Sequence, residues 1–267
     1  MSDLTTRVAE LLRDKTIDLF IGYGKGTKDR IRAIFLTEPE EAEKLVYNEK
    51  CEQNLAVYLL KDEVKHSGKI GFFASPFALR AMLQQASEFQ FKNGAILALH
   101  IDTEGKLREF ADFKSIEDYL ISIDTGISPE DKERIAVIRA MGKQERWEFW
   151  MKEFSKCIKC YACRAACPLC YCHRCTTDCN QPQWIPVAAH DLGNLNWHLM
   201  RAMHLSGRCV NCGDCARACP MDIPLNLLTY CLVEDIEKDF DFVAGMKSDG
   251  LYALSTFKPD DKENFIR

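Results

Sequence analysis

The sequence predicts an α+β protein in which a small α/β domain precedes a helical, cysteine-rich region. Apolar runs alternate with helical segments through the first 125 residues, which favours a partly parallel sheet. Twelve of the fourteen cysteines lie between residues 157 and 179 or between 209 and 219. We therefore expect an α/β domain at 1–125, a helical linker at 126–156, a cysteine-rich domain at 157–240 with an insertion at 169–208, and a C-terminal tail at 241–267.

Within the first domain, four apolar runs predict strands, at residues 17–23, 31–36, 69–74 and 95–101. Residues 4–12 have the apolar spacing of a helix, and residues 55–60 predict another. Ser75-Pro76 predicts a helix start, because serine caps the first turn and proline suits its first position. Thr37-Glu38-Pro39-Glu40 predicts a further helix that begins with a capping box.

Two charged helices are expected in the linker. The first begins at Ser128-Pro129 and runs to Met141. The second covers residues 145–154 and carries the aromatic stripe Trp147, Trp150 and Phe154. We expect this stripe to pack against the cysteine-rich domain, with a docking surface for a partner as the alternative interpretation.

The cysteine-rich domain contains one twelve-residue motif twice. The first copy is Cys157-x-x-Cys160-x-x-Cys163-x-x-x-Cys167-Pro168. The second is Cys209-x-x-Cys212-x-x-Cys215-x-x-x-Cys219-Pro220, in which each residue lies 52 positions after its counterpart. This spacing is the one that bacterial-type ferredoxins use to hold two [4Fe–4S] clusters. The motif therefore predicts one-electron transfer.

In such a pair of motifs, the fourth cysteine of each copy binds the cluster of the other copy. We therefore assign Cys157, Cys160, Cys163 and Cys219 to a first cluster, and Cys209, Cys212, Cys215 and Cys167 to a second. Disulfides and zinc are less favoured interpretations. Disulfide frameworks suit small secreted chains, and zinc sites usually combine two Cys-x-x-Cys pairs.

A third group of cysteines lies in the insertion between the two motifs, as Cys170-x-Cys172-x-x-Cys175-x-x-x-Cys179. A third iron–sulfur cluster, a zinc site and unligated thiols all remain open, since both kinds of metal site accept four thiolates. His173 lies within the group and could be a ligand, but we expect it to donate a hydrogen bond to a sulfur or to face water. Leu195, Leu199 and Met203 predict a helix over residues 194–205 with those side chains on its apolar face.

Composition narrows the choice of partners. The formal net charge of −5 does not favour nucleic-acid binding, and no apolar run of about 18 residues predicts a membrane span. The polar first fifteen residues do not look like a secretion signal. Reduced cysteines at this density favour the cytoplasm, and oxygen-sensitive clusters favour an anaerobe. No small-molecule substrate can be identified.

Two resemblances follow from these residues. The segments 157–167 and 209–219 resemble the two-[4Fe–4S] ferredoxin domain. Residues 18–60, with Gly22-Tyr23-Gly24-Lys25-Gly26 and Asn54-Leu55-Ala56, resemble the N-terminal part of the coenzyme F420 hydrogenase/dehydrogenase beta-subunit family, which includes formate dehydrogenase beta subunits. The likeness continues over residues 69–85 with Leu79-Arg80-Ala81, although the Lys-Gly-Cys turn of that family reads Phe73-Ala74-Ser75 here.

The resemblances imply an electron-relay subunit of a cytosolic redox complex of the formate dehydrogenase, hydrogenase or heterodisulfide-reductase-like kind. Other subunits of that complex would be its partners. The alternative is a flavin-dependent reductase of a diffusible cofactor such as F420. Flavin is not expected, since the long flavin-binding region of full-length F420-reducing subunits has no counterpart in this sequence.

Overall fold

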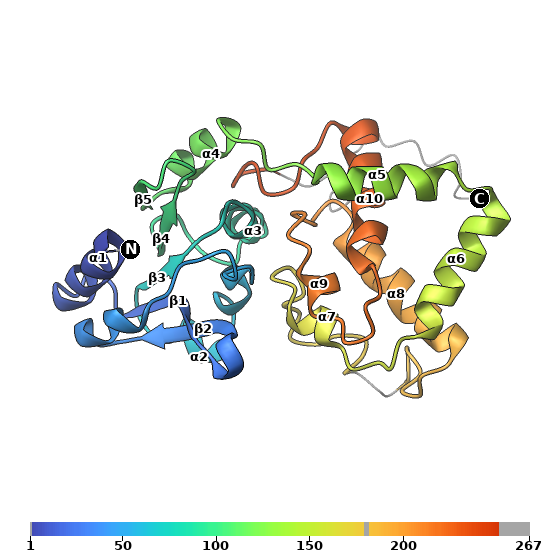
Figure 1. Ribbon diagram of the computed structural model, residues 1–267, viewed down its shortest axis with the longest axis horizontal. Helices are drawn as coiled ribbons and strands as arrows, with labels where there is room; N and C mark the ends of the chain where they lie inside the picture. The colour runs from blue at the N-terminus through green and yellow to red at the C-terminus, as the bar shows by residue number, and fades with distance from the viewer. Residues whose placement is uncertain (1, 179–181, 251–267) are drawn as a thin grey trace.

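The computed structural model describes residues 2–178 and 182–250, in which a five-stranded sheet precedes a helical, cysteine-rich region (Figure 1). The strand order is β2-β1-β3-β4-β5. The strands are β1 (Leu19–Lys25), β2 (Ile31–Leu36), β3 (Ile70–Phe73), β4 (Ile96–Ile101) and β5 (Leu107–Phe110). Strands β1, β3 and β4 are parallel, whereas β2 and β5 pair antiparallel at the two edges. The predicted mixed α/β architecture is thus confirmed for this part of the chain.

The central strands of the sheet are paired in register and covered on both faces. Phe20 pairs with Gly71, and Ile70 pairs with Ile96. All four residues of β3 are buried, as expected for a central parallel strand that is covered on both sides. At one edge, β1 continues into a hairpin, in which the Gly26 amide donates to the Arg30 carbonyl at 2.7 Å.

The helices of the sheet-containing part are α1 (Ser2–Arg13), α2 (Asp62–Lys65), α3 (Pro76–Ser87) and α4 (Phe113–Ile121). Ser75 caps α3 as predicted, since its side chain accepts from the Ala78 amide. The predicted capping box is wrong. Only a 3-10 helix, Pro39–Lys44, forms there, and the Thr37 amide donates instead to the Glu41 carboxylate at 3.2 Å. Two further 3-10 helices are Thr27–Asp29 and Leu55–Tyr58.

The cysteine-rich part is helical. Its helices are α5 (Pro129–Ala140), α6 (Lys143–Ser155), α7 (Ala162–Ala165), α8 (Asp191–Leu205), α9 (Asp214–Arg217) and α10 (Leu225–Phe240). Helix α5 packs on α10, and α6 packs on α8 (Figure 1). Of the aromatic stripe on α6, Phe154 is buried and stacks on Trp150, whereas Trp147 is 51% exposed. Packing therefore accounts for two of the three aromatic residues.

The segment after α10 returns to the sheet-containing part. Arg80 of α3 is buried and donates from Nε and Nη2 to the Ala244 carbonyl, at 3.1 and 2.7 Å. Its Nη1 donates to the Thr125 carbonyl at 2.8 Å. Gly245 has a φ of +73°, and a Cβ there would lie 2.2 Å from the Arg80 carbonyl oxygen. The first part of the predicted tail therefore packs on α3, and residues 251–267 lie outside the described residues. None of the described helices is long and apolar enough to cross a membrane.

Candidate iron–sulfur sites

The two cysteine motifs fold in the same way. In the first, Lys159 and Tyr161 have φ values of 53° and 57°; at the equivalent positions of the second, Asn211 and Gly213 have 64° and 75°. Three of these four left-handed residues are not glycine, which is uncommon and costs conformational energy. Each loop then enters a single-turn helix, α7 or α9, that starts after Tyr161 or Gly213. The sequence repeat is therefore also a structural repeat.

Two small cavities lie against these loops. One cavity, of about 20 Å³, is lined by Cys157, Cys160, Cys163 and Cys219 among others. A second, also of about 20 Å³, is lined by Cys167, Cys209, Cys212 and Cys215 among others. We call these the first and second cavity. Each contains three cysteines of one motif and the last cysteine of the other, which is the grouping assigned from the sequence. The roles of these cysteines as ligands stay predictions.

In neither set of four cysteines do the sulfurs converge on a single point. Within residues 2–178 and 182–250, no three His, Cys, Asp or Glu side chains are placed to hold one metal ion. A cube needs a different arrangement, because each of its four irons takes its own thiolate. Four cysteines spaced around a cavity are therefore the appropriate donor set for a cube.

Burial controls the charge of these sulfurs. It raises the pKa of the Cys163 and Cys209 thiols to about 11, and it raises the pKa of Cys215 as well. Without iron these thiols are therefore protonated at neutral pH. Because metal ligation requires thiolates, cluster binding would release their protons and would place negative charge in both cavities.

Helix α8, which lies in the insertion between the motifs, faces both cavities with polar side chains. Asn194, Trp197, His198 and Arg201 are each at most 4% exposed. Trp197 and His198 line the first cavity, and Arg201 lines the second. The predicted apolar face of this helix is wrong, since Leu199 and Met203 are 45% and 62% exposed. The helix buries its polar stripe because the cysteine loops lie beneath it, together with a small apolar cluster that includes Phe154 and Ile223.

The buried stripe of α8 holds the first loop directly. The Asn194 amide nitrogen donates to the carbonyls of Phe154 and Cys157, at 3.0 and 2.9 Å. Arg201 donates from Nη2 to the Cys163 carbonyl at 3.2 Å. His198 stacks on Phe154 with ring centroids 4.7 Å apart, and burial lowers its pKa to about 4, so it is neutral. The roles of Asn194, Trp197 and Arg201 were not predicted from the sequence, although their helical spacing was a visible signal.

These features fit two [4Fe–4S] clusters. Such a cluster with four thiolates is an anion, and its stability and potential depend on N–H groups around its sulfurs. Each cavity offers four cysteines, and the buried Arg201 guanidinium lines the second cavity. Cys51 and Cys231 are half-buried and line neither cavity.

The third group of cysteines borders another cavity, of about 330 Å³. Cys170, Cys172 and Cys175 line it together with Arg164, Arg201 and Arg208. Cys170 is hydrogen-bonded to Cys167, and this bond lowers the pKa of Cys167 and raises that of Cys170. His173 is exposed. Cys179 lies outside the described residues, so the predicted set of four is only partly visible.

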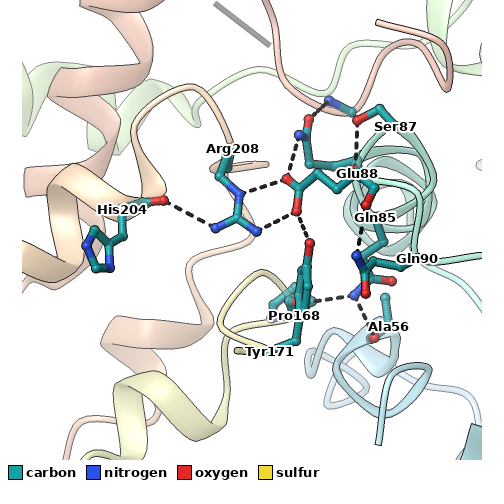
Figure 2. A network of polar contacts seen from close by, with 11 residues as sticks. Ala56, Gln85, Ser87, Glu88, Gln90, Pro168, Tyr171, His204 and Arg208 are labelled. Atoms are coloured by element: carbon teal, nitrogen blue, oxygen red, sulfur yellow. Dashed lines mark hydrogen bonds and ion pairs between the residues drawn. The ribbon is translucent and has the colours of Figure 1, made fainter. Parts of the chain in front are cut away.

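A polar network ties the second cavity to α3 (Figure 2). The Arg208 guanidinium donates from Nε and Nη2 to the two Glu88 carboxylate oxygens, at 2.7 and 2.5 Å. The Tyr171 hydroxyl donates to the same carboxylate, and Gln85 donates to the Pro168 carbonyl at 2.8 Å. Arg208 precedes Cys209 and Pro168 follows Cys167 in the sequence. Helix α3 therefore contacts both segments that bring cysteines to the second cavity.

A second contact joins the same parts. The main-chain amide of Asn54 donates to the Asp214 carboxylate at 2.7 Å, and Asp214 precedes Cys215 in the sequence. The first cavity differs, because its residue Cys160 is exposed and the adjacent Ile158 is 56% exposed. The second cavity is thus built against the sheet-containing part, and the first lies nearer the surface.

The structure is that of a mixed α/β protein with two groups of four cysteines. Comparison with known proteins shows relatives for part of the chain. A 100-residue segment is 37% identical to the F420-dependent formate dehydrogenase subunit beta of Methanocaldococcus jannaschii, and covers 37% of this chain and 26% of that protein. A 107-residue segment is 31% identical to the F420-dependent formate dehydrogenase 1 subunit beta of Methanococcus maripaludis, and covers 40% and 27%. The chain thus matches about a quarter of the length of these relatives. No protein-family model matches it.

These matches confirm the predicted likeness to formate dehydrogenase beta subunits for part of the chain. They relate it to a redox subunit. The predicted likeness to ferredoxins stays a prediction.

The Glu88–Arg208 pair should contribute measurably to stability, because both side chains are nearly buried, at 10% and 12% exposed. We expect Glu88→Gln to remove the carboxylate that balances the Arg208 charge and to lower the unfolding temperature by roughly 5–10 °C. The measurement is thermal unfolding of the anaerobically purified chain, followed by circular dichroism.

The matched control is Glu234→Gln, which removes the same charge from an exposed pair with Arg139. Its unfolding temperature should change by less than about 2 °C. Equal shifts in both variants would contradict a special role for the Glu88–Arg208 pair.

Proposed function

We propose that this chain is an iron–sulfur electron-transfer subunit of a cytosolic oxidoreductase complex. Cys157, Cys160, Cys163 and Cys219 would hold a first [4Fe–4S] cluster. Cys209, Cys212, Cys215 and Cys167 would hold a second. The observation that carries the proposal is the lining of the two cavities, each of which combines three cysteines of one motif with the fourth of the other.

When bound, the clusters would supply one-electron transfer. The residues of the chain hold, orient and shield them. Asn194 and Arg201 fix the backbone of the first loop through the carbonyls of Cys157 and Cys163. Helix α3 and Asn54 fix the segments around the second cavity. We propose no catalytic residue, because electron transfer needs neither a nucleophile nor an acid–base group.

Membership in a complex is supported by the relatives, whose names describe them as subunits of formate dehydrogenases. Hydrogenase and heterodisulfide-reductase-like complexes are further candidates, as the resemblances imply. Exposed apolar side chains suit a partner: Leu192, Leu199 and Met203 lie on one face of α8, and Ile158 lines the first cavity together with Cys160. We place the exchange of electrons with a partner at the first cluster, because its cavity lies nearer the surface.

The relatives also favour a second candidate function, since both are named F420-dependent. In that account, the sheet-containing part would bind flavin and reduce a diffusible cofactor such as F420. The two functions differ in one observable property, which is the presence of flavin.

The cysteines of the insertion form a further proposal. We propose that Cys170, Cys172 and Cys175, with Cys179, hold a third metal centre, a [4Fe–4S] cluster or zinc. The shared cavity of the first three supports it, and both metals accept thiolate ligands.

Crossed ligation makes a specific prediction. In a Cys157→Ser/Cys160→Ser background, the first cluster should be lost and the second retained. A further Cys167→Ser should then remove the remaining cluster, whereas a further Cys219→Ser should spare it. Iron content and the EPR signal of the dithionite-reduced chain measure both. The reverse pattern would show that each motif serves its own cluster.

The third centre is tested by metal analysis of the anaerobically purified chain. Two clusters require roughly eight irons per chain, a third cluster raises this to roughly twelve, and zinc adds about one zinc ion. Cys172→Ser/Cys175→Ser should remove only the additional metal, and Cys51→Ser serves as the control. Unchanged iron and zinc in the double variant would contradict the third centre.

The visible spectrum separates the two functions. The electron-transfer subunit should show the broad absorbance of iron–sulfur clusters, and its acid-precipitated supernatant should contain no flavin fluorescence. Stoichiometric flavin, together with F420 reduction by the chain alone, would favour the reductase instead.

A further inference from the structure

Arg201 is a positive charge buried between the two cavities. It is only 4% exposed, and it lines the second cavity beside Cys167 and Cys215. Its Nη2 donates to the carbonyl of Cys163, whose residue lines the first cavity. One guanidinium therefore contacts the surroundings of both candidate clusters.

Other buried arginines have conventional partners, and Arg201 is different. Arg80 donates to two main-chain carbonyls, and Arg208 forms a bidentate pair with Glu88. The Nε of Arg201 has no hydrogen-bond partner among the described residues. A buried cation without a carboxylate is costly, so this position favours an anion at the sulfurs.

Trp197, one helical turn before Arg201, repeats this arrangement at the first cavity. Its indole is 3% exposed, and its Nε1 has no hydrogen-bond partner in the described part of the chain. The indole lines the first cavity together with Cys163. Its buried N–H is therefore available as a donor to a sulfur in that cavity. Such a donor to a sulfur ligand stabilises negative charge on it.

We propose that Arg201 and Trp197 set the reduction potentials of the two clusters, with Arg201 acting mainly on the second cluster and Trp197 on the first. This inference rests on the proposed function. When a cluster accepts one electron from a donor, the site gains one negative charge. A fixed positive charge or an N–H dipole in a site that excludes water favours that state and raises the potential. Both are positioning residues, since neither is a ligand.

The test uses the full chain, purified anaerobically, as Arg201→Met, Arg201→Lys and Trp197→Phe. The control is Arg139→Met, which removes an exposed arginine of α5 that pairs with Glu234 and Asp235. Iron is measured first, and EPR-monitored titrations with dithionite then give the potentials. At a fixed ambient potential, Arg201→Met should shift one cluster about tenfold toward its oxidised form, about 59 mV for a one-electron couple.

Arg201→Lys should stay near the wild-type potentials, because it keeps the charge. Trp197→Phe keeps an aromatic ring but loses the N–H. It should therefore shift the other cluster about threefold toward its oxidised form at a fixed ambient potential. Loss of iron in Arg201→Met, with iron retained in Arg201→Lys, would also support the inference. It would show that binding of the anionic cluster requires a positive charge at this position.

Two results would overturn the inference. One is full iron content in Arg201→Met with potentials equal to those of Arg139→Met. The other is an Arg201→Lys variant that changes as much as Arg201→Met, in potential or in iron content, since the side chain would then act through packing alone. A wild-type chain without iron would instead refute the proposed function itself, so the two failures can be told apart.

Discussion

The arrangement of the cysteine-rich region depends on one constraint: each group of four cysteines that lines a cavity is completed by a residue of the other motif. Cys219 lines the cavity of the first motif, and Cys167 lines the cavity of the second. The single-turn helices α7 and α9 must therefore lie side by side, and they do contact each other. Neither loop lines its cavity alone. The left-handed residues of both loops are the conformational cost of turning three cysteines around one small space.

The constraint makes the two sites alike, and their surroundings make them different. The second cavity borders the core of the sheet-containing part, with Cys167 and Cys212 packed against that core. Contacts from Glu88, Gln85 and Asn54 reach the segments that carry its cysteines. The first cavity is covered by α6 and α8 and has an exposed cysteine, Cys160. In the proposed account, the chain therefore connects a site near the surface with a site that is held by the sheet-containing part, and this arrangement suits a relay.

Periodicity and spacing predicted much of this from the sequence. Four of the five strands and helices α1, α3, α5, α6 and α8 correspond to predicted segments, because each has a clear apolar pattern or cap. Strand β5 was missed, since its four residues include Arg108 and Glu109 and its pairing with β4 is a tertiary event. The Thr37 capping box was wrong, because the 3-10 helix that begins at Pro39 has Glu38 as its N-cap and no side chain caps it.

The site was predicted where its determinants are local in the sequence. Repeated spacing was enough to group the eight cysteines into the two sets that line the cavities. The roles of Asn194, Trp197 and Arg201 could not be predicted in the same way. Leu195, Leu199 and Met203 indicated the wrong buried face of α8, because apolar side chains are assumed to face a core. Only the position of the cysteine loops shows that the polar face is the buried one.

The most direct test of the central claim is the Mössbauer spectrum of the chain, produced with ⁵⁷Fe and purified without oxygen. The account predicts that the iron of both motifs, roughly eight atoms per chain, is present as [4Fe–4S] clusters that dithionite can reduce. A chain that contains zinc in these two groups, isolated iron in tetrahedral thiolate sites, or no metal would contradict it.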